Sequence, residues 1–302
     1  MPKTDYVELG NRERIPILYE DRAALALDKP PGWMLVPVNW QSTGHNLQAA
    51  LLSSIEAGFF WARSRNLRFL RYVHRLDAET SGVLLFARSP GALEALSGLF
   101  ESRVVDKLYL AVVRGVPRAA EWTCDLRLAP DPRSHGRVIV DRRQGKEALT
   151  HFQRLQTLNL GPGRDITLVE ARPHTGRTHQ IRVHLAATGC PVLGDELYGG
   201  GERDRPPRAF PLGLRSVELA YRDPFTRRPV RIEAPRDAFL RAFGFKPVFP
   251  TRATPPPPPP VPDEPPRDPV HPDADAGAGT RTRPAKPAAR PGGAQAATRR
   301  TR

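Results

Sequence analysis

The sequence predicts an α/β (α+β) fold with a mixed, mostly antiparallel central sheet and a few flanking helices. Short apolar or alternating runs of strand length recur along the chain, and they outnumber the helical patterns. These runs do not alternate regularly with helices, as a parallel sheet of βαβ units would require. Two pairs of runs are joined by short polar turns, which is typical of antiparallel hairpins.

The first predicted elements are a hairpin and a turn. Residues 15–20 and 24–28 are short apolar runs separated by Asp21-Arg22, which predicts a hairpin. The sequence KPPG at residues 29–32 then forces an irregular turn, because proline fixes its own backbone and glycine permits unusual angles.

A buried strand and a capped helix are predicted next. The strand is the continuous apolar run at residues 83–87. Ser89 offers an N-cap and Pro90 the first helical position, so a helix is expected to run to about Glu101. Its apolar face consists of Leu93, Leu96, Leu99 and Phe100.

Two strands, one helix and a second hairpin complete the predicted fold. The helix is expected to close at Gly189, because glycine adopts the left-handed conformation that ends many helices. The strands are residues 107–113 and 166–171, the helix is residues 178–188, and the hairpin joins residues 217–221 to 230–234 across residues 223–226.

The composition favours a polyanionic partner. The chain has 302 residues and a formal net charge of +14, and arginine supplies 40 of its 46 basic residues. A guanidinium group binds two phosphate oxygens at once, so nucleic acid is the first expected partner and an acidic membrane surface the second. A general compositional bias towards arginine would give the same count, so this observation alone does not identify the partner.

Several other classes of protein are disfavoured. Two cysteines exclude a disulfide framework and a cysteine-built zinc site. No apolar run approaches the ~20 residues that span a bilayer, and residues 1–10 lack the apolar centre of a secretory signal. The sequence GKE at residues 145–147 lacks the features of a phosphate-cradling loop, so no nucleotide cofactor is expected. A cytoplasmic protein without a membrane partner is the expectation.

The composition also predicts where the folded part ends. Residues 250–302 hold 15 of the 34 prolines and almost no large apolar side chains. Such a segment cannot bury enough surface to offset its ordering entropy. We therefore expect a disordered Pro/Arg-rich tail at residues 248–302, a catalytic domain at residues 15–247 and a short N-terminal extension at residues 1–14.

Two polar clusters are candidates for chemistry. HRLDAETSG at residues 74–82 precedes a predicted strand, and loops held by a rigid sheet often carry functional groups. RPHTGRTHQIRVH at residues 172–184 is basic and contains three histidines spaced by five. That spacing places successive histidines about 140° apart on a helix, so they are a weak metal signal. The alternative interpretation of the first cluster is a structural turn without chemistry. For the second cluster, a phosphate-binding surface is the alternative to a metal site.

These clusters resemble motifs of the RluA family of RNA pseudouridine synthases. The three principal matches are HRLDxxTSG at residues 74–82, KxY at 107–109 and HTGRTHQIRVH at 174–184. Shorter matches occur at residues 17–21, 29–32, 145–150 and 194–199, in the family's order. The resemblance covers about residues 15–235 and implies the pseudouridine synthase fold with an RNA-binding cleft.

The resemblance also implies an activity and the residues that carry it. Family members convert uridine in RNA to pseudouridine, an isomerisation that needs no metal or other cofactor. Asp77 matches the essential carboxylate, which either attacks the sugar C1′ or acts along a glycal route. Arg182 matches the residue that pairs with this carboxylate, and Tyr109 the tyrosine that stacks on the flipped uracil.

Four further residues are expected to bind RNA. Arg75 matches a residue that occupies the space vacated in the RNA stack, and the others are expected to support the loop or contact phosphate. This RNA-binding set is Arg75, His74, Arg177 and His179. No small RNA-binding domain of the S4 type fits before residue 15, which favours tRNA or a short rRNA stem-loop as the partner of a monomer.

One departure and two alternatives accompany this hypothesis. Many family members carry Leu-His-Ala where this chain has Leu214-Arg215-Ser216, which puts the contacts at the pocket rim in doubt. One alternative is a catalytically silent RNA-binding module. The other is a metal-dependent hydrolase built on the three histidines.

Overall fold

The computed structural model describes residues 3–35, 45–199 and 211–247. Residues Met1–Pro250 form one compact unit. The expected tail at residues 248–302 lies outside the described residues. No helix in the described part of the chain is long and apolar enough to cross a bilayer.

Eleven of the described strands form one mixed sheet. Its central path is β1-β2-β3-β5-β12-β6-β11-β10-β7, with β13 paired to β12 and β4 to β5. Only the β12–β5 pairing is parallel among these strands, which confirms the predicted mostly antiparallel sheet. The strands of this sheet are β1 Tyr6–Glu8, β2 Arg14–Glu20, β3 Ala24–Lys29, β4 Arg71–Tyr72, β5 Ser81–Ala87, β6 Asp106–Arg114, β7 Glu121–Cys124, β10 Thr150–Leu158, β11 Ile166–Pro173, β12 Leu214–Arg222 and β13 Pro229–Glu233. A separate hairpin pairs β8 Leu128–Pro130 with β9 Val138–Val140.

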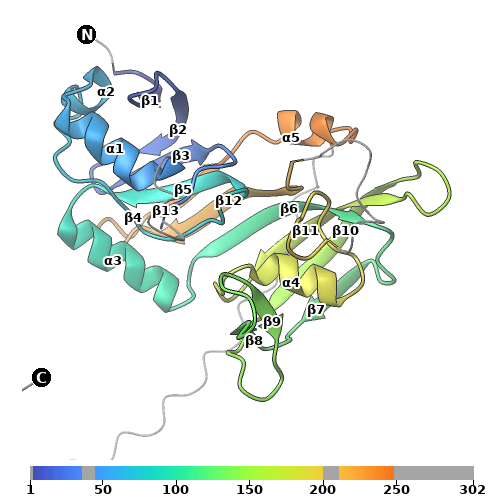
Figure 1. Ribbon diagram of the computed structural model, residues 1–302. Coiled ribbons are helices and arrows are strands. Elements are labelled where there is room, and N and C mark those ends of the chain that lie inside the picture. Colours follow the sequence, from blue (N-terminus) through green and yellow to red (C-terminus); the bar gives the residue numbers. More distant parts are fainter. Residues whose placement is uncertain (1–2, 36–44, 200–210, 248–302) are drawn as a thin grey trace, which may run out of the picture. The chain divides into compact units, whose positions relative to one another are not determined.

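The helices lie around this sheet (Figure 1). The described helices are α1 Leu47–Glu56, α2 Phe60–Arg63, α3 Pro90–Glu101, α4 Gln180–Ala187 and α5 Asp237–Ala242. Both predicted hairpins and the α3 helix are confirmed. Ser89 caps α3, because its hydroxyl accepts the Ala92 N–H at 3.2 Å.

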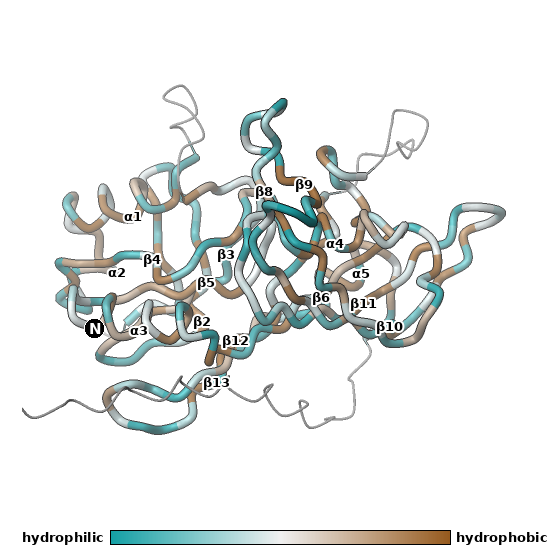
Figure 2. Tube along the Cα trace, turned by 90° about the horizontal axis from the view of Figure 1, so that it is seen from below, coloured by the Kyte–Doolittle hydropathy of each residue, from teal (hydrophilic) through white to brown (hydrophobic). Residues whose placement is uncertain are grey.

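Strand β6 separates two packed layers. Its odd-numbered residues from Tyr109 to Val113 join a core with α4, whereas its even-numbered residues from Leu108 to Val112 pack against α5. This period of two is the side-chain alternation of a strand buried on both faces. The tube coloured by hydropathy shows the loop between β8 and β9 as a projecting hydrophilic segment (Figure 2). Because of this alternation, Tyr109 lies on the face that carries α4.

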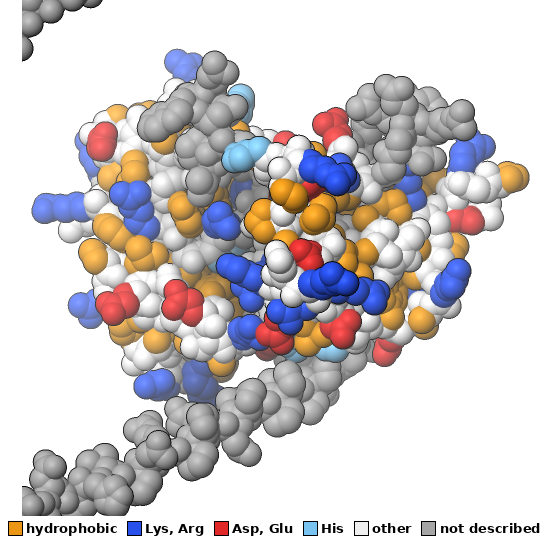
Figure 3. Space-filling view, turned by 60° about the horizontal axis from the view of Figure 1, so that its bottom comes forward, with side chains coloured by type: hydrophobic (Ala, Val, Ile, Leu, Met, Phe, Trp, Pro, Cys, Tyr) orange, Lys and Arg blue, Asp and Glu red, His pale blue; other side chains and the backbone are white. Residues whose placement is uncertain are grey.

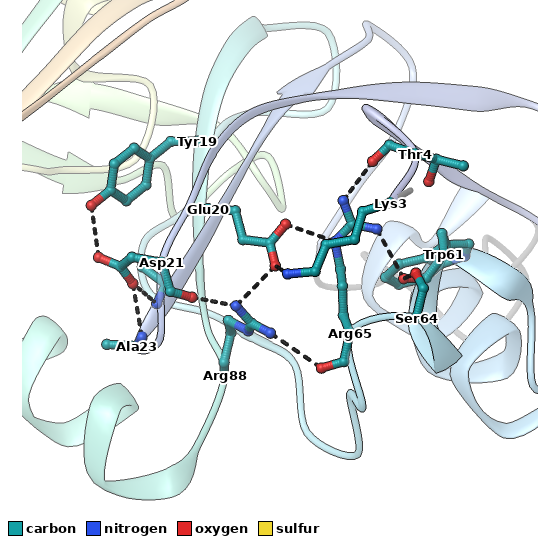
Figure 4. A network of polar contacts seen from close by, with 11 residues as sticks. Lys3, Thr4, Tyr19, Glu20, Asp21, Ala23, Trp61, Ser64, Arg65 and Arg88 are labelled. Atoms are coloured by element: carbon teal, nitrogen blue, oxygen red, sulfur yellow. Dashed lines mark hydrogen bonds and ion pairs between the residues drawn. The ribbon is translucent and has the colours of Figure 1, made fainter. Parts of the chain in front are cut away.

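A single glutamate ties the N-terminal strands to the helices (Figure 4). The Glu20 carboxylate accepts from Arg65 Nε at 2.8 Å, from Lys3 at 2.9 Å and from Arg88 at 3.1 Å. Burial alone would raise the pKa of Glu20, but these cations outweigh it and the pKa lies below its ordinary value. The network joins three separate chain segments, so it stabilises the sheet edge that β1 and β2 form.

The parallel contact between β5 and β12 depends on one glycine. Gly82 has a φ of +109°, and a Cβ there would lie 1.9 Å from the Ser216 carbonyl oxygen. Any side chain would therefore push β12 away from β5. This close approach places the loop before β5 next to the centre of the sheet.

Some elements were not predicted from the sequence. They include α1, β10, the β8–β9 hairpin and β1, which pairs with β2 although it lies within the expected N-terminal extension. Helix α4 begins at Gln180 rather than at residue 178, because His179 adopts the left-handed conformation with a φ of +53°. Gly189 follows this helix with a φ of +83°, as the predicted closing residue requires.

Candidate active site

Asp77 lies in the loop between β4 and β5, and a buried lysine fixes this loop. The Lys29 ammonium, which is 0% exposed, donates to the carbonyl oxygens of Pro30, Ala78 and Thr80 at 2.7–2.9 Å. All three protons of the ammonium are thereby used on the backbone. Sequence reasoning noted Lys29 within a motif but gave it no role. The structure makes it the anchor of the Asp77 loop.

Asp77 and Asp195 share one arginine. Arg182 Nη1 donates to Asp77 Oδ2 at 3.1 Å, while its Nε and Nη2 donate to the two oxygens of Asp195 at 2.7 and 2.8 Å. Asp195 is fully buried as a side chain, whereas 22% of Asp77 remains exposed. Two carboxylates on one guanidinium leave the trio with a formal charge of −1. The predicted Asp77–Arg182 pairing is present, and Asp195 is the partner that sequence reasoning missed.

The charge of Arg182 is held by its neighbours. Burial opposes its charged form, but Asp195 and Asp77 outweigh this effect and raise the pKa of Arg182 above the ordinary arginine value. Asp195 is itself fixed, because its Oδ1 also accepts the backbone N–H groups of Leu197 and Tyr198 at 3.0 and 3.1 Å. The guanidinium therefore presents a pre-positioned donor to Asp77.

Tyr109 forms another wall of the site. It extends from β6 and is 8% exposed. A hydrogen bond joins its hydroxyl to Ser216, which lies opposite it on β12. Burial is the main cause that raises the pKa of Tyr109 to about 12, and the nearby Asp77 charge adds to it. The phenol therefore keeps its proton at neutral pH.

The basic motif at residues 174–184 is folded by Gln180. Its Oε1 accepts the Thr175 hydroxyl at 2.7 Å and the Arg177 N–H at 3.0 Å, while its Nε2 donates to Leu149 O and Thr150 Oγ1. Every polar group of this buried amide has a partner. The loop before α4 is thus held against β10, with Arg177 at its outer edge.

Two pockets meet at Asp77. One of about 640 Å³ extends towards Tyr109 and Lys107, and the other of about 750 Å³ extends towards Leu197. Asp77, Arg182, Arg75 and Arg177 line both pockets. Figure 3 shows Lys and Arg side chains gathered along the middle of the visible face. The two pockets therefore adjoin at Asp77, and arginine side chains line both.

The four expected RNA-binding residues lie at different depths. Arg75 is exposed, and Arg177 is half-buried with its Nε donating to Glu147 O at 2.8 Å. The His74 ring stacks on Phe100 at 4.8 Å, and its Nε2 accepts the Leu85 N–H at 3.2 Å. These contacts tie His74 to the fold, and an RNA contact by its ring stays a prediction.

The three histidines of the basic motif do not converge. His184 is buried between Thr150 Oγ1 and Leu126 O, at 3.0 Å from each. The His174 ring packs edge-on against His151, with centroids 4.8 Å apart, and His179 faces Asp77. No group of three or more His, Cys, Asp or Glu within the described ranges is arranged to hold a metal ion.

The arginine that departs from the family pattern, Arg215, does not line either pocket. Arg215 points away from the pocket and donates to Asp28 Oδ2 at 2.8 Å, Ser81 Oγ at 3.2 Å and Pro235 O at 2.9 Å. Its neighbour Leu214 lines the pocket instead. The added charge lies outside the residues that line the two pockets, because side chains alternate between the two faces of a strand.

Comparisons with known proteins place the chain in a family. The profile of the RNA pseudouridylate synthase family matches residues 25–187. An RNA pseudouridine synthase of Zymomonas mobilis is 37% identical over 232 residues, covering 76% of this chain and 97% of that protein. The ribosomal large subunit pseudouridine synthase C of Escherichia coli is 34% identical over 236 residues, covering 74% of this chain and 67% of the relative.

A solved structure extends the comparison to the fold. The human RNA pseudouridylate synthase domain containing 1 superposes with a TM-score of 0.61 and 28% identity, covering 78% of this chain and 89% of that chain. The family model and these relatives thus define an isomerase that acts on RNA. The chain belongs to the RNA pseudouridylate synthase family, within its RluA group.

Proposed function

We propose that this enzyme isomerises specific uridines in a stem-loop of ribosomal RNA, with Asp77 as its catalytic carboxylate. The observation that carries the proposal is the position of Asp77, which lines both pockets and is paired through Oδ2 with the pre-positioned Arg182. Among the described residues no Lys or Arg forms an ion pair with Asp77 Oδ1, which faces His179 Nε2 at 3.9 Å. Oδ1 thus keeps at least one lone pair that can face the substrate.

The reaction breaks the bond between uracil N1 and C1′, turns the base and joins C5 to C1′. The hydrogen at C5 is lost as a proton and N1 gains one, so the reaction is balanced without an oxidant or reductant. Asp77 either attacks C1′ or removes a proton from the sugar along a glycal route. Both routes require an ionised carboxylate, and the Arg182 guanidinium lies 3.1 Å from this one.

The other residues take supporting roles in this proposal. Tyr109 stacks on the flipped uracil, since an aromatic face compensates the stacking that a base loses when it leaves the helix. Arg75 is exposed at the mouth of both pockets and fills the vacated space in the RNA stack. Arg177 contacts phosphate, and His74 and His179 hold the loops that do so.

Ribosomal RNA is the substrate class that the relatives favour. The Escherichia coli relative and a Borreliella burgdorferi relative, 34% identical over 187 residues, are both named ribosomal large subunit pseudouridine synthases. We propose that the enzyme works in the cytoplasm as a monomer. A tRNA substrate is the alternative, and the same assay distinguishes the two.

The test follows tritium released from uracil C5. Purified full-length protein is incubated with ribosomal RNA or tRNA labelled at C5, beside Asp77→Asn. Release from ribosomal RNA by the wild type alone supports the proposal, and Asp77→Asn should bind the RNA within a few fold of wild type. Release from tRNA only would contradict the proposal that ribosomal RNA is the substrate. Release by Asp77→Asn would contradict the proposal that Asp77 is the catalytic carboxylate.

A further inference from the structure

Tyr198 connects three parts of the site that are far apart in the sequence. Its hydroxyl accepts the Val138 N–H from the β8–β9 hairpin at 2.9 Å and lies 2.8 Å from His179 Nδ1. Its ring stacks edge-on against His179 and lies 5.2 Å from the Arg182 guanidinium. The motif around Tyr198 was recognised in the sequence without a role for this residue.

The protons of this contact can be assigned from the donors and acceptors present. A backbone N–H only donates, so the hydroxyl accepts from Val138 and has its own proton free for a second partner. On the other side of the imidazole, His179 Nε2 faces Asp77 Oδ1 at 3.9 Å. A bare Nε2 lone pair turned towards a carboxylate would be repelled, so Nε2 carries the ring proton. Nδ1 is then the acceptor, and Tyr198 is its donor.

We propose that Tyr198 is a positioning residue whose hydroxyl fixes the neutral Nε2–H tautomer of His179, so that this N–H is directed at Asp77 Oδ1. The carboxylate is then held from two sides, by Arg182 on Oδ2 and by His179 on Oδ1. A distance of 3.9 Å shortens to a hydrogen bond with a small movement, as catalytic contacts commonly do when substrate binds. The inference rests on the proposed role of Asp77.

Two independent features support this assignment. His179 has a φ of +53°, a conformation that non-glycine residues seldom adopt, and it persists here at the start of α4. This backbone turns the imidazole towards Asp77 and Tyr198 rather than towards the N-terminus of the helix, where it makes no capping bond. Burial lowers the pKa of His179 and raises that of Tyr198, so the imidazole is neutral and the phenol protonated at pH 7.5.

Nuclear magnetic resonance of the full-length wild-type protein reports the tautomer directly. Long-range ¹⁵N–¹H spectra at pH 7.5 distinguish protonated from bare ring nitrogens, and His179→Gln assigns the signals of His179. We expect a bare Nδ1 and a protonated Nε2 in the wild type. A protonated Nδ1 would overturn the proposal, whether or not the enzyme is active on the RNA tested.

A double-mutant cycle tests the consequence for catalysis. In Tyr198→Phe, the two His179 tautomers should mix, and kcat for tritium release should fall about fivefold with little change in KM, the size expected for one lost hydrogen bond. Gln at residue 179 retains an N–H donor, so Tyr198→Phe should have no further effect on kcat in a His179→Gln background. The matched control is Tyr221→Phe, which removes a buried hydroxyl without a partner in the described part of the chain.

The outcomes of this cycle separate the two proposals. The positioning role of Tyr198 would be overturned if Tyr198→Phe lowered kcat by the same factor in the His179→Gln background as in the wild type. It would also be overturned if the His179 tautomer were unchanged in Tyr198→Phe. A wild type that releases no tritium from any RNA would overturn the proposed function, while the tautomer in the wild-type spectrum would still report on the Tyr198–His179 contact.

Discussion

Arg182 gives Asp195 two hydrogen bonds, at 2.7 and 2.8 Å, and gives Asp77 only one at 3.1 Å. The stronger pairing is therefore with the buried carboxylate that does not line either pocket. This asymmetry indicates that Asp195 fixes the guanidinium of Arg182 and that the guanidinium in turn orients Asp77. Removing the Arg182–Asp195 contact or the Arg182–Asp77 contact should therefore have different effects on stability and on activity.

Asp195→Asn should lower both the stability and the activity. Arg182 would lose the carboxylate that balances its charge, and breaking a buried pair typically costs about 3–5 kcal/mol. We expect the lower end of this range, because the amide oxygen still accepts one hydrogen bond and Asp77 remains. Urea unfolding and tritium release measure the two effects. Asp237→Asn is the control, because Asp237 is 55% exposed and 4.0 Å from Arg241; equal losses in both variants would contradict the role of Asp195.

Gly82→Ala should destabilise the protein, because it separates the two strands β5 and β12 next to the site. The added Cβ would lie 1.9 Å from the Ser216 carbonyl, and the φ of +109° disfavours any side chain. We expect a loss of several kcal/mol of unfolding free energy or no folded protein, since backbone would have to move. Gly91→Ala is the matched control on α3, where a Cβ would meet nothing within 4 Å. A thermal unfolding midpoint for Gly82→Ala equal to that of Gly91→Ala would refute the close-approach argument.

His74 should make the fold sensitive to acid. Burial, with the Lys107 charge as a second cause, lowers the pKa of His74 from 6.5 to about 3. As the pH falls through 6.5 the unfolded chain binds a proton that the folded protein does not bind. The free energy of unfolding therefore decreases as the pH falls from 6.5 towards 3, by at most about 1.4 kcal/mol per pH unit.

Denaturant unfolding at pH 7, 6 and 5 measures this effect. His74→Gln retains an acceptor for the Leu85 N–H but has no proton to bind, so its stability should fall less steeply below pH 6.5. Substituting the exposed His135 by Gln should leave the wild-type slope unchanged. Identical slopes for His74→Gln and wild type would show that this imidazole does not control the acid sensitivity.

Arg75→Ala should weaken RNA binding through electrostatics. Arg75 is exposed at the mouth of both pockets, and a lost phosphate contact reduces the slope of log K against log salt by about 1. Filter binding of a ribosomal RNA fragment across a salt series measures this slope. Arg241→Ala, an exposed residue on α5, is the control with equal loss of charge. If both variants alter the slope equally, Arg75 contributes only its charge to RNA binding and makes no specific phosphate contact.

The local elements of this protein could be predicted because their causes are local. Asp21 closes the β2–β3 hairpin by accepting the Ala23 and Ala24 N–H groups at 2.7 and 2.6 Å, and Ser89 caps α3 from one residue away. Such contacts span a few residues, so the sequence pattern contains both partners. The predicted helix at residues 178–188 starts two residues earlier than α4, because the backbone at His179 is determined by the site around it.

The sequence by itself determined the hairpins, the capped helix, the mostly antiparallel sheet and, by resemblance, the family and its candidate residues. Only the tertiary structure decided that Asp195 holds Arg182, that Lys29 anchors the Asp77 loop and that Tyr198 reaches both His179 and the β8–β9 hairpin. Asp77 and Arg182 are 105 residues apart. They meet because β5, β12 and β6 are neighbours in the sheet, and this order depends on pairing energies summed over whole strands rather than on any short pattern.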